Sequence, residues 1–179
     1  MKETSLDILK QKASKIQWLF TDVDGTLTDG GVYYSPDGEL LKQFSLRDGT
    51  GFFLLREAGI KTGIVTGENS PIVAQRAKKL KVDKYLYGSN KKVEVMQQFL
   101  DENGLSFENI AYIGDDLNDV KLLKVCGLSF AVRDADKHTK DVADVICEHN
   151  GGQGAFREAV EILLNLRGVK FEEIIERSL

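Results

Sequence analysis

The most constraining feature of this sequence is a hydrophobic stretch, residues 18–21, that runs directly into two aspartates, Asp22 and Asp24, and then into Gly25. A short apolar run without polar alternation is typical of a strand buried on both faces of a parallel sheet. Side chains at i and i+2 share one face while the strand stays regular, and a glycine lets the chain turn just beyond them. The sequence therefore predicts a central strand whose end presents two carboxylates to one cleft.

Further apolar segments alternate with helical segments along the chain. Strands are expected at residues 62–66, 85–87, 110–114, 128–132 and 145–147, and helices at residues 3–14, 48–58, 70–80, 89–103, 117–125, 137–142 and 159–166. Asp48, Ser70 and Ser89 are the expected N-cap residues, and Pro71 strengthens the start at Ser70. This alternation predicts a single α/β domain over residues 1–179 with a parallel, doubly wound sheet. A glycine-rich segment and a charged tail occupy residues 151–179.

A β-hairpin is expected at about residues 32–45, between the first strand and the first helix that follows it. Its two arms flank Ser35-Pro36-Asp37-Gly38, in which proline at the second position and glycine at the fourth fit a type I turn. The hairpin carries Tyr33, Tyr34 and Phe44, which would leave an exposed apolar patch if nothing covered them.

The composition excludes several classes of protein. A chain of 179 residues that is 42% hydrophobic is long enough for one buried core, and its net charge of −4 gives no basic surface for nucleic acid. No apolar run approaches the length of a membrane span, and the first residues lack the apolar core of a signal peptide. We therefore expect a cytoplasmic protein without a membrane or nucleic-acid partner.

The segment Asp22-Val23-Asp24-Gly25-Thr26 resembles the Asp-x-Asp-Gly-Thr motif of the haloacid dehalogenase-like phosphatases. Three further elements follow in the order of that family: Thr66 at a strand end, Lys92 at a helix start, and Asp115 within Gly-Asp-Asp-Leu-Asn-Asp. The alternative is that Asp22 and Asp24 merely cap a turn, as aspartate often does. That alternative explains one motif and not four.

The resemblance implies a Rossmann-like fold with its site at the carboxyl ends of the strands, where ligands bind in such sheets. It also implies that Asp22 attacks phosphorus to give an aspartyl-phosphate. Asp24 would protonate the leaving alkoxide and later deprotonate the attacking water. Thr66 and Lys92 would hold the phosphoryl oxygens.

A phosphate dianion is repelled by a carboxylate nucleophile, so such a site needs a hard divalent cation with oxygen ligands. The resemblance implies Mg²⁺, held by the side chains of Asp22 and Asp115 and the backbone carbonyl of Asp24. Asp116 or Asp119 would be a further ligand or would support the ligands from behind. Acids at these two positions would equally complement the dipole of the following helix.

Larger relatives insert a cap domain that covers the substrate, and this chain has little room for one. The interval from Asp24 to Thr66 is filled by the hairpin and one helix, and the interval from Thr66 to Lys92 by a helix and a short strand. No cap domain is therefore expected. An open site admits water, so another subunit is the simplest cover.

The hairpin, Leu46-Arg47-Asp48-Gly49 and the glycine-rich segment at residues 151–158 resemble one capless branch of the family. That branch includes the tetrameric 3-deoxy-D-manno-octulosonate 8-phosphate phosphatases, and it implies a homotetramer whose active sites are completed by neighbouring subunits. Arg157, within the glycine-rich segment, would recognise the carboxylate of a sugar-acid phosphate. Its alternative role is a structural ion pair with Glu158 or Glu161.

Two positions separate the candidate substrates. Glu68 follows Thr66-Gly67 where the octulosonate enzymes commonly carry arginine, and together with Lys79 it resembles relatives that act on 2-keto-3-deoxynononate 9-phosphate or sialic acid 9-phosphate. We therefore expect Gly67, Glu68 and Lys79 at the substrate and favour a nine-carbon acid. The alternative is 3-deoxy-D-manno-octulosonate 8-phosphate, a precursor in lipopolysaccharide biosynthesis, which Arg47-Asp48-Gly49 favours.

An alternative of another class is a non-catalytic tetramerisation module, as in the phosphatase-like tail domains of some acylneuraminate cytidylyltransferases. In such modules the catalytic acids are typically degraded, whereas here Asp22, Asp24 and Asp115 are all present. The enzyme is therefore the favoured interpretation.

Overall fold

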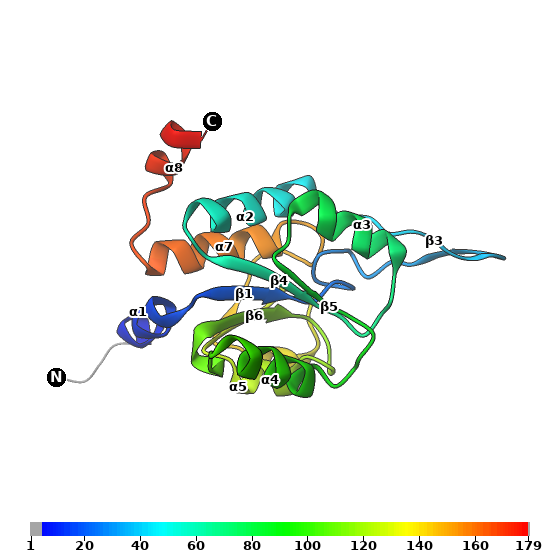
Figure 1. Cartoon of the computed structure of the whole chain (residues 1–179), viewed down its shortest axis with the longest axis horizontal. Helices are drawn as coiled ribbons and strands as arrows, with labels where there is room; N and C mark the ends of the chain where they lie inside the picture. Colours follow the sequence, from blue (N-terminus) through cyan, green and yellow to red (C-terminus); the bar gives the residue numbers. More distant parts are fainter. Residues whose placement is uncertain (1–4, 179) are drawn as a thin grey trace.

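A computed structural model describes residues 5–178, and Figure 1 shows one sheet with helices on both faces. Every neighbouring pair of strands in this sheet is parallel. From one edge to the other, the strands are β5 (Lys84–Leu86), β4 (Lys61–Val65), β1 (Trp18–Thr21), β6 (Ile110–Gly114), β7 (Leu128–Ala131) and β8 (Val145–Ile146). The chain winds outward from β1 first to one edge and then to the other. The predicted doubly wound α/β sheet is confirmed.

The two faces of the sheet carry separate hydrophobic clusters, and the alternation along β1 divides its side chains between them. Leu19 packs in the cluster beneath α2 (Leu46–Glu57), α3 (Pro71–Leu80) and α7 (Ala155–Leu166). Phe20 packs in the cluster beneath α4 (Lys92–Asn103) and α5 (Val120–Val125). All four residues of β1 are buried, as expected of the central strand of a covered parallel sheet.

The remaining elements lie around this frame. They are α1 (Ser5–Lys15), the 3₁₀ turn η1 (Phe107–Asn109), α6 (Lys137–Lys140) and α8 (Phe171–Ser178). The expected start of the first helix, at residue 3, lies outside the described residues. The charged tail includes α8, in which Ile174 is buried against the core. Helix α7 also begins at Ala155, four residues before its expected start.

Ser70 caps α3 as predicted: its hydroxyl accepts the Val73 N–H, and Pro71 is the first helical residue. The prediction that Asp48 is the N-cap of α2 is wrong, because Ser45 occupies that position and accepts the Asp48 N–H. The Asp48 carboxylate instead accepts the backbone N–H groups of Gly154 and Arg157, 3.2 and 2.9 Å away, at the start of α7. This acid therefore caps the neighbouring helix.

Two other helix starts differ from the sequence-based expectation. Ser89 does not cap α4, because Lys91 is the N-cap and the Ser89 hydroxyl accepts the Lys91 N–H. Helix α5 begins at Val120 rather than at residue 117. Residues 115–119 form a turn instead, held by the side chain of Asp119.

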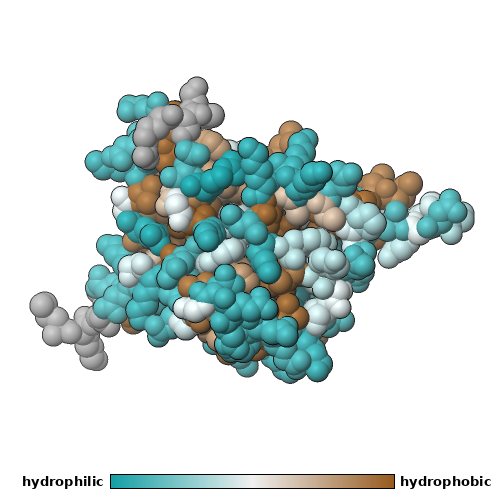
Figure 2. Space-filling model, viewed as in Figure 1, coloured by the Kyte–Doolittle hydropathy of each residue, from teal (hydrophilic) through white to brown (hydrophobic). Residues whose placement is uncertain are grey.

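The predicted hairpin is confirmed as β2 (Tyr33–Ser35) and β3 (Gly38–Leu41), and it projects from the body of the molecule (Figure 1). Figure 2 shows hydrophobic side chains on this projecting end. Five large hydrophobic residues there are exposed: Val32, Tyr33, Tyr34, Leu40 and Leu41. Phe44, expected in this patch, instead packs partly against the core beneath the guanidinium of Arg76.

Between β1 and β4 the chain forms only the hairpin and α2, and between β4 and α4 only α3 and β5. Residues 5–178 therefore include no cap domain in either interval, as predicted. None of the helices in this range is long and apolar enough to cross a bilayer. The cytoplasmic location expected from the sequence stays a prediction.

Candidate active site

The carboxyl edge of the sheet holds a cavity of about 160 Å³. Asp22 lies just beyond β1, Thr66 beyond β4 and Asp115 beyond β6, so three neighbouring strands deliver polar groups to one place. The cavity is lined by Asp22, Asp24, Thr66, Gly67, Glu68, Asn90, Asp115, Asp116 and Asn118. The structure thus brings together most of the residues singled out in the sequence. Asn90 and Asn118 were missed, although Asn118 lies within the Gly-Asp-Asp-Leu-Asn-Asp motif itself.

Lys92 is the first residue of α4, and its side chain extends to Asp22 at the cavity. Its ammonium lies 2.8 Å from Asp22 Oδ1 and 2.6 Å from Asp119 Oδ1, and the whole residue is only 2% exposed. Burial would lower the pKa of Lys92, but the two carboxylates raise it above its ordinary value. Lys92 therefore stays a cation directly beside the expected nucleophile.

Asp119 supports this arrangement with both of its oxygens. Oδ1 accepts from Lys92 and from the Tyr112 hydroxyl, which is 2.6 Å away. Oδ2 accepts the backbone N–H groups of Asp115 and Asp116, at 2.9 and 3.2 Å. Asp119 is fully buried, whereas Asp116 is exposed at the cavity and its Oδ1 accepts the Leu117 N–H. Asp119 thus lies buried behind Asp115 and Asp116, whereas Asp116 faces the opening of the cavity, and the role of each acid at a metal ion stays a prediction.

Carboxylate oxygens of Asp22, Asp115 and Asp119 all lie within 4.8 Å of one another. Burial raises the pKa of Asp22 to about 7, with repulsion from Asp119 adding to the effect. Burial and repulsion from Asp22 likewise raise the pKa of Asp115 to about 8. Buried carboxylates that lie this close together are stabilised by a hard divalent cation, so this donor set fits one.

Gly25 allows these acids to approach one another. Its φ is +84°, and a Cβ atom at this position would lie 2.0 Å from Asp115 Oδ2. Any other residue would be strained there and would push Asp115 out of place. The glycine of the motif is therefore required by both the backbone and the acid opposite it.

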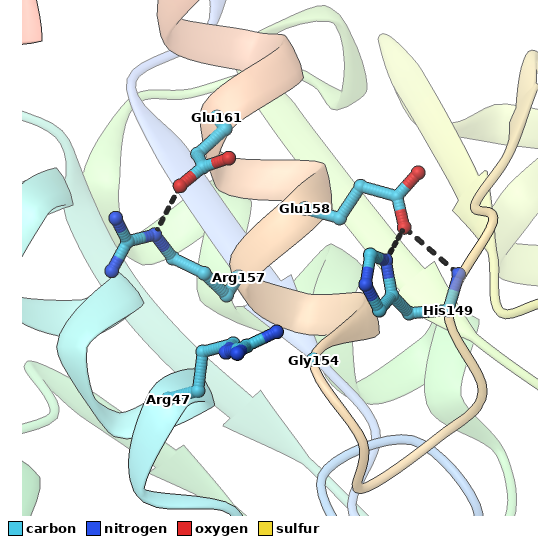
Figure 3. Close-up of a pocket in the computed structure, with 6 residues that line it drawn as sticks. All are labelled: Arg47, His149, Gly154, Arg157, Glu158 and Glu161. Carbon is cyan, nitrogen blue, oxygen red and sulfur yellow. Dashed lines mark hydrogen bonds and ion pairs between the residues drawn. The ribbon is translucent and has the colours of Figure 1, made fainter.

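Lys79 and Arg157 do not line this cavity. Lys79 is exposed in the last turn of α3. Arg157 lines a separate pocket of about 240 Å³ at the start of α7 (Figure 3), together with Arg47, His149, Gly154, Glu158 and Glu161. Figure 3 shows the Arg157 side chain turned toward Glu161, 2.6 Å from Nε to Oε1, and His149 turned toward Glu158. Within one chain, Lys79 and Arg157 therefore lie outside the cavity that contains Asp22, Asp24 and Asp115.

A carboxylate paired with a buried lysine at the open edge of a capless sheet, together with the family to which the chain is similar, defines the class: this protein is a phosphoric monoester hydrolase. A family model described as haloacid dehalogenase-like hydrolase matches residues 87–158, and the chain belongs to this family. All the acids of its motifs are in place, so the non-catalytic alternative finds no support.

The chain is 38% identical over 160 residues to the 3-deoxy-D-manno-octulosonate 8-phosphate phosphatase of Haemophilus influenzae, covering 89% of each chain. The cobalt-bound structure of the Haemophilus influenzae enzyme matches with a TM-score of 0.84 over 88% of this chain and 92% of that one.

The enzyme of the same name from Moraxella catarrhalis, solved in complex with a magnesium ion, a phosphate ion and a KDO molecule, is 34% identical. It matches with a TM-score of 0.89 over 94% of this chain and 96% of that one. These relatives agree with the octulosonate alternative. The nine-carbon preference drawn from Glu68 and Lys79 is not confirmed.

Proposed function

We propose that this enzyme hydrolyses the phosphate ester of 3-deoxy-D-manno-octulosonate 8-phosphate with Mg²⁺ as its cofactor. The observation that carries the proposal is the cavity that gathers Asp22, Asp24 and Asp115 above Lys92. The names of the relatives supply the sugar acid, and their cobalt- and magnesium-bound structures support a divalent ion.

Asp22 is the proposed nucleophile. It attacks phosphorus, the P–O bond to the sugar breaks, and Asp24 gives its proton to the leaving oxygen. Water then attacks the aspartyl-phosphate, Asp24 takes a proton from it, and phosphate leaves with Asp22 restored. Asp24 suits this role because its side chain is 29% exposed and lines the cavity, whereas Asp22 is nearly buried.

The phosphoryl group needs donors that are fixed before it arrives. Thr66 is 2% exposed and lines the cavity, and its hydroxyl oxygen accepts the Glu68 N–H at 3.2 Å, which leaves the hydroxyl proton for a ligand. Lys92 adds a charge that two carboxylates hold in one position. We propose that these two groups hold the phosphoryl oxygens.

The residues that would hold the ion are the side chains of Asp22 and Asp115 and the backbone carbonyl of Asp24, with Asp119 behind them. When bound, Mg²⁺ supplies positive charge that offsets the repulsion between the phosphate dianion and the carboxylates. The raised pKa values of Asp22 and Asp115 support this assignment, because burial and mutual repulsion destabilise the two carboxylates and a bound cation would stabilise them.

Glu68 supports a second candidate substrate. It is exposed and lines the cavity beside Thr66 and Gly67, where a charge contacts whatever lies beyond the phosphate. A carboxylate there would accept hydrogen bonds from a polyol chain, which favours the 9-phosphates of 2-keto-3-deoxynononate or sialic acid. In that case Glu68→Arg should shift kcat/KM toward the 8-phosphate, because arginine would offer donors in place of acceptors.

We also propose a homotetramer in which neighbouring subunits complete each site. The exposed side chains of the hairpin form an apolar patch that a second copy would bury. Lys79 and Arg157, which lie apart from the acids of their own chain, would then act in a neighbour's site. Multi-angle light scattering that gives only a monomer would contradict this proposal.

The direct test is phosphate release from the 8-phosphate and the two 9-phosphates by the purified protein with Mg²⁺. We expect the highest kcat/KM with 3-deoxy-D-manno-octulosonate 8-phosphate and loss of activity with a chelator. Hydrolysis of p-nitrophenyl phosphate without turnover of any sugar-acid phosphate would refute the substrate while leaving the phosphatase intact.

A further inference from the structure

Lys42, just beyond β3 in the projecting hairpin, is buried although lysine is normally exposed. Its side chain is 2% exposed, and its ammonium pairs with Asp24 Oδ1 and lies 2.9 Å from Glu39 Oε1. A buried ammonium is costly unless anions surround it. The two acids therefore fix Lys42 in place, and Lys42 in turn fixes them.

This contact belongs to a chain that connects three parts of the fold. Glu39, in β3, accepts a hydrogen bond from the hydroxyl of Ser70, which is the N-cap of α3. The Lys42 ammonium pairs with Glu39 and also with Asp24, which lies in the turn that follows β1. The carboxylate at the cavity is thus anchored to the hairpin and, through Glu39, to α3.

The anchor leaves half of the Asp24 carboxylate available. Lys42 occupies Oδ1, and no hydrogen bond within residues 5–178 engages Oδ2. Without this partner the side chain could rotate between staggered positions, and proton transfer needs the oxygen within hydrogen-bond reach of the leaving group.

We propose that Lys42 is a positioning residue that holds Asp24 with Oδ2 toward the leaving oxygen of the substrate. This inference rests on the proposed acid role of Asp24. It gives the hairpin a task inside its own active site, separate from any contact between subunits.

The experiment compares kcat/KM for two esters, because kcat/KM reports the first step, in which Asp24 acts only as an acid. p-Nitrophenyl phosphate has a leaving group that hardly needs a proton, whereas the alkoxide of 3-deoxy-D-manno-octulosonate 8-phosphate needs one. If wild type does not cleave the sugar ester, the substrate proposal fails, and propyl phosphate replaces it as the alkyl ester for Lys42.

We expect Lys42→Gln to lower kcat/KM for the alkyl ester by about 10- to 100-fold, a part of what general acid catalysis contributes. The value for p-nitrophenyl phosphate should change less than about threefold. Lys42→Arg should recover much of the loss, because arginine can also pair with both acids. In an Asp24→Asn background Lys42→Gln should cost nothing further, because the carboxylate it positions is already gone.

Lys12→Gln is the matched control, because it removes an ion pair with Asp144 at 2.5 Å that lies outside the residues of the cavity. It should leave both esters unchanged. Lys42→Gln leaves Glu39 as well as Asp24 without its cation. If this variant does not fold, the double variant Glu39→Gln/Lys42→Gln, which also removes the charge of Glu39, takes its place in every measurement. Equal losses on both esters, or no loss on either, would overturn the inference.

Discussion

The acid cavity and the arginine pocket at the start of α7 differ in how deeply their charged side chains are buried and how completely they are paired. Beside the cavity, Lys92 and Asp119 are buried, and each contacts polar groups of the same chain at 2.6–3.2 Å. In the arginine pocket, Arg47 is exposed and makes no ion pair with residues 5–178, and the side chain of Arg157 is 24% exposed. The charges at the acid cavity are thus buried and paired within one chain, whereas the arginine pocket leaves Arg47 exposed and pairs Arg157 with Glu161.

The largest effect should come from Asp22, the proposed nucleophile. Asp22→Asn should lower phosphate release by at least about 10³-fold, because an amide is a poor nucleophile and the metal site loses a ligand. The protein should still fold, since the substitution removes a buried carboxylate whose pKa is raised. Burst and steady-state phosphate assays check this, and near-wild-type turnover would contradict the mechanism.

The buried lysine should dominate stability. Lys92→Met leaves Asp22 and Asp119 buried without their cation and should lower the free energy of unfolding by about 3–5 kcal/mol. Lys91→Met is the matched control one residue earlier, where the side chain is 73% exposed, and it should change little. Urea unfolding measures both, and equal effects would mean that the burial of Lys92 carries no special weight.

The arginine pocket should matter for the sugar acid alone. Arg157→Ala should raise KM for the sugar-acid phosphate roughly 30-fold. This corresponds to about 2 kcal/mol of binding free energy, the contribution of a charge-assisted hydrogen bond. p-Nitrophenyl phosphate lacks the carboxylate, so its KM should hardly change.

Mixing Arg157→Ala subunits with Asp22→Asn subunits sharpens this comparison. Activity should recover if the arginine works across an interface. An equal loss of activity toward both substrates would mean that Arg157 acts only through its ion pair with Glu161.

The stability of the metal-free protein should also depend on pH, through the raised pKa values of two carboxyl groups in the cavity. Asp22 and Asp115 have folded-state pKa values of about 7 and about 8, above the ordinary value of 3.8. As pH rises from about 4 to about 8, the unfolded chain loses these protons before the folded one, so stability falls. Each pKa unit corresponds to about 1.4 kcal/mol, so two shifts of this size should cost several kcal/mol of stability between pH 5 and pH 8, and Tm in a chelator should drop by roughly 10 °C or more.

Mg²⁺ should restore the lost stability at pH 8, and Asp115→Asn should flatten the pH profile. Thermal unfolding followed by circular dichroism suffices for both measurements. A metal-free Tm that rises with pH would show that these carboxylates are not crowded as the structure has them.

The sequence was sufficient to predict the groups that follow strands. Asp22, Thr66 and Asp115 meet because parallel strands share one carboxyl edge, and that rule needs no side-chain detail. Lys42 was not predicted, because nothing in its neighbours indicates that a hairpin lysine is buried against Asp24. The N-cap role of Asp48 was misassigned for the same reason: its true partners, Gly154 and Arg157, lie more than a hundred residues away.

Two hydrogen bonds from the start of α7 to the Asp48 carboxylate join two segments that are distant in the sequence, residues 46–49 and 151–158. Asp48 is only 2% exposed, so water cannot replace the hydrogen bonds that its carboxylate accepts. Within the described residues, the N–H groups of Gly154 and Arg157 have no other acceptor. Among homologues, the two segments should therefore vary as one unit. A chain that replaces the acid should also remodel the glycine-rich segment, and a transplant of either segment alone into another scaffold should fail.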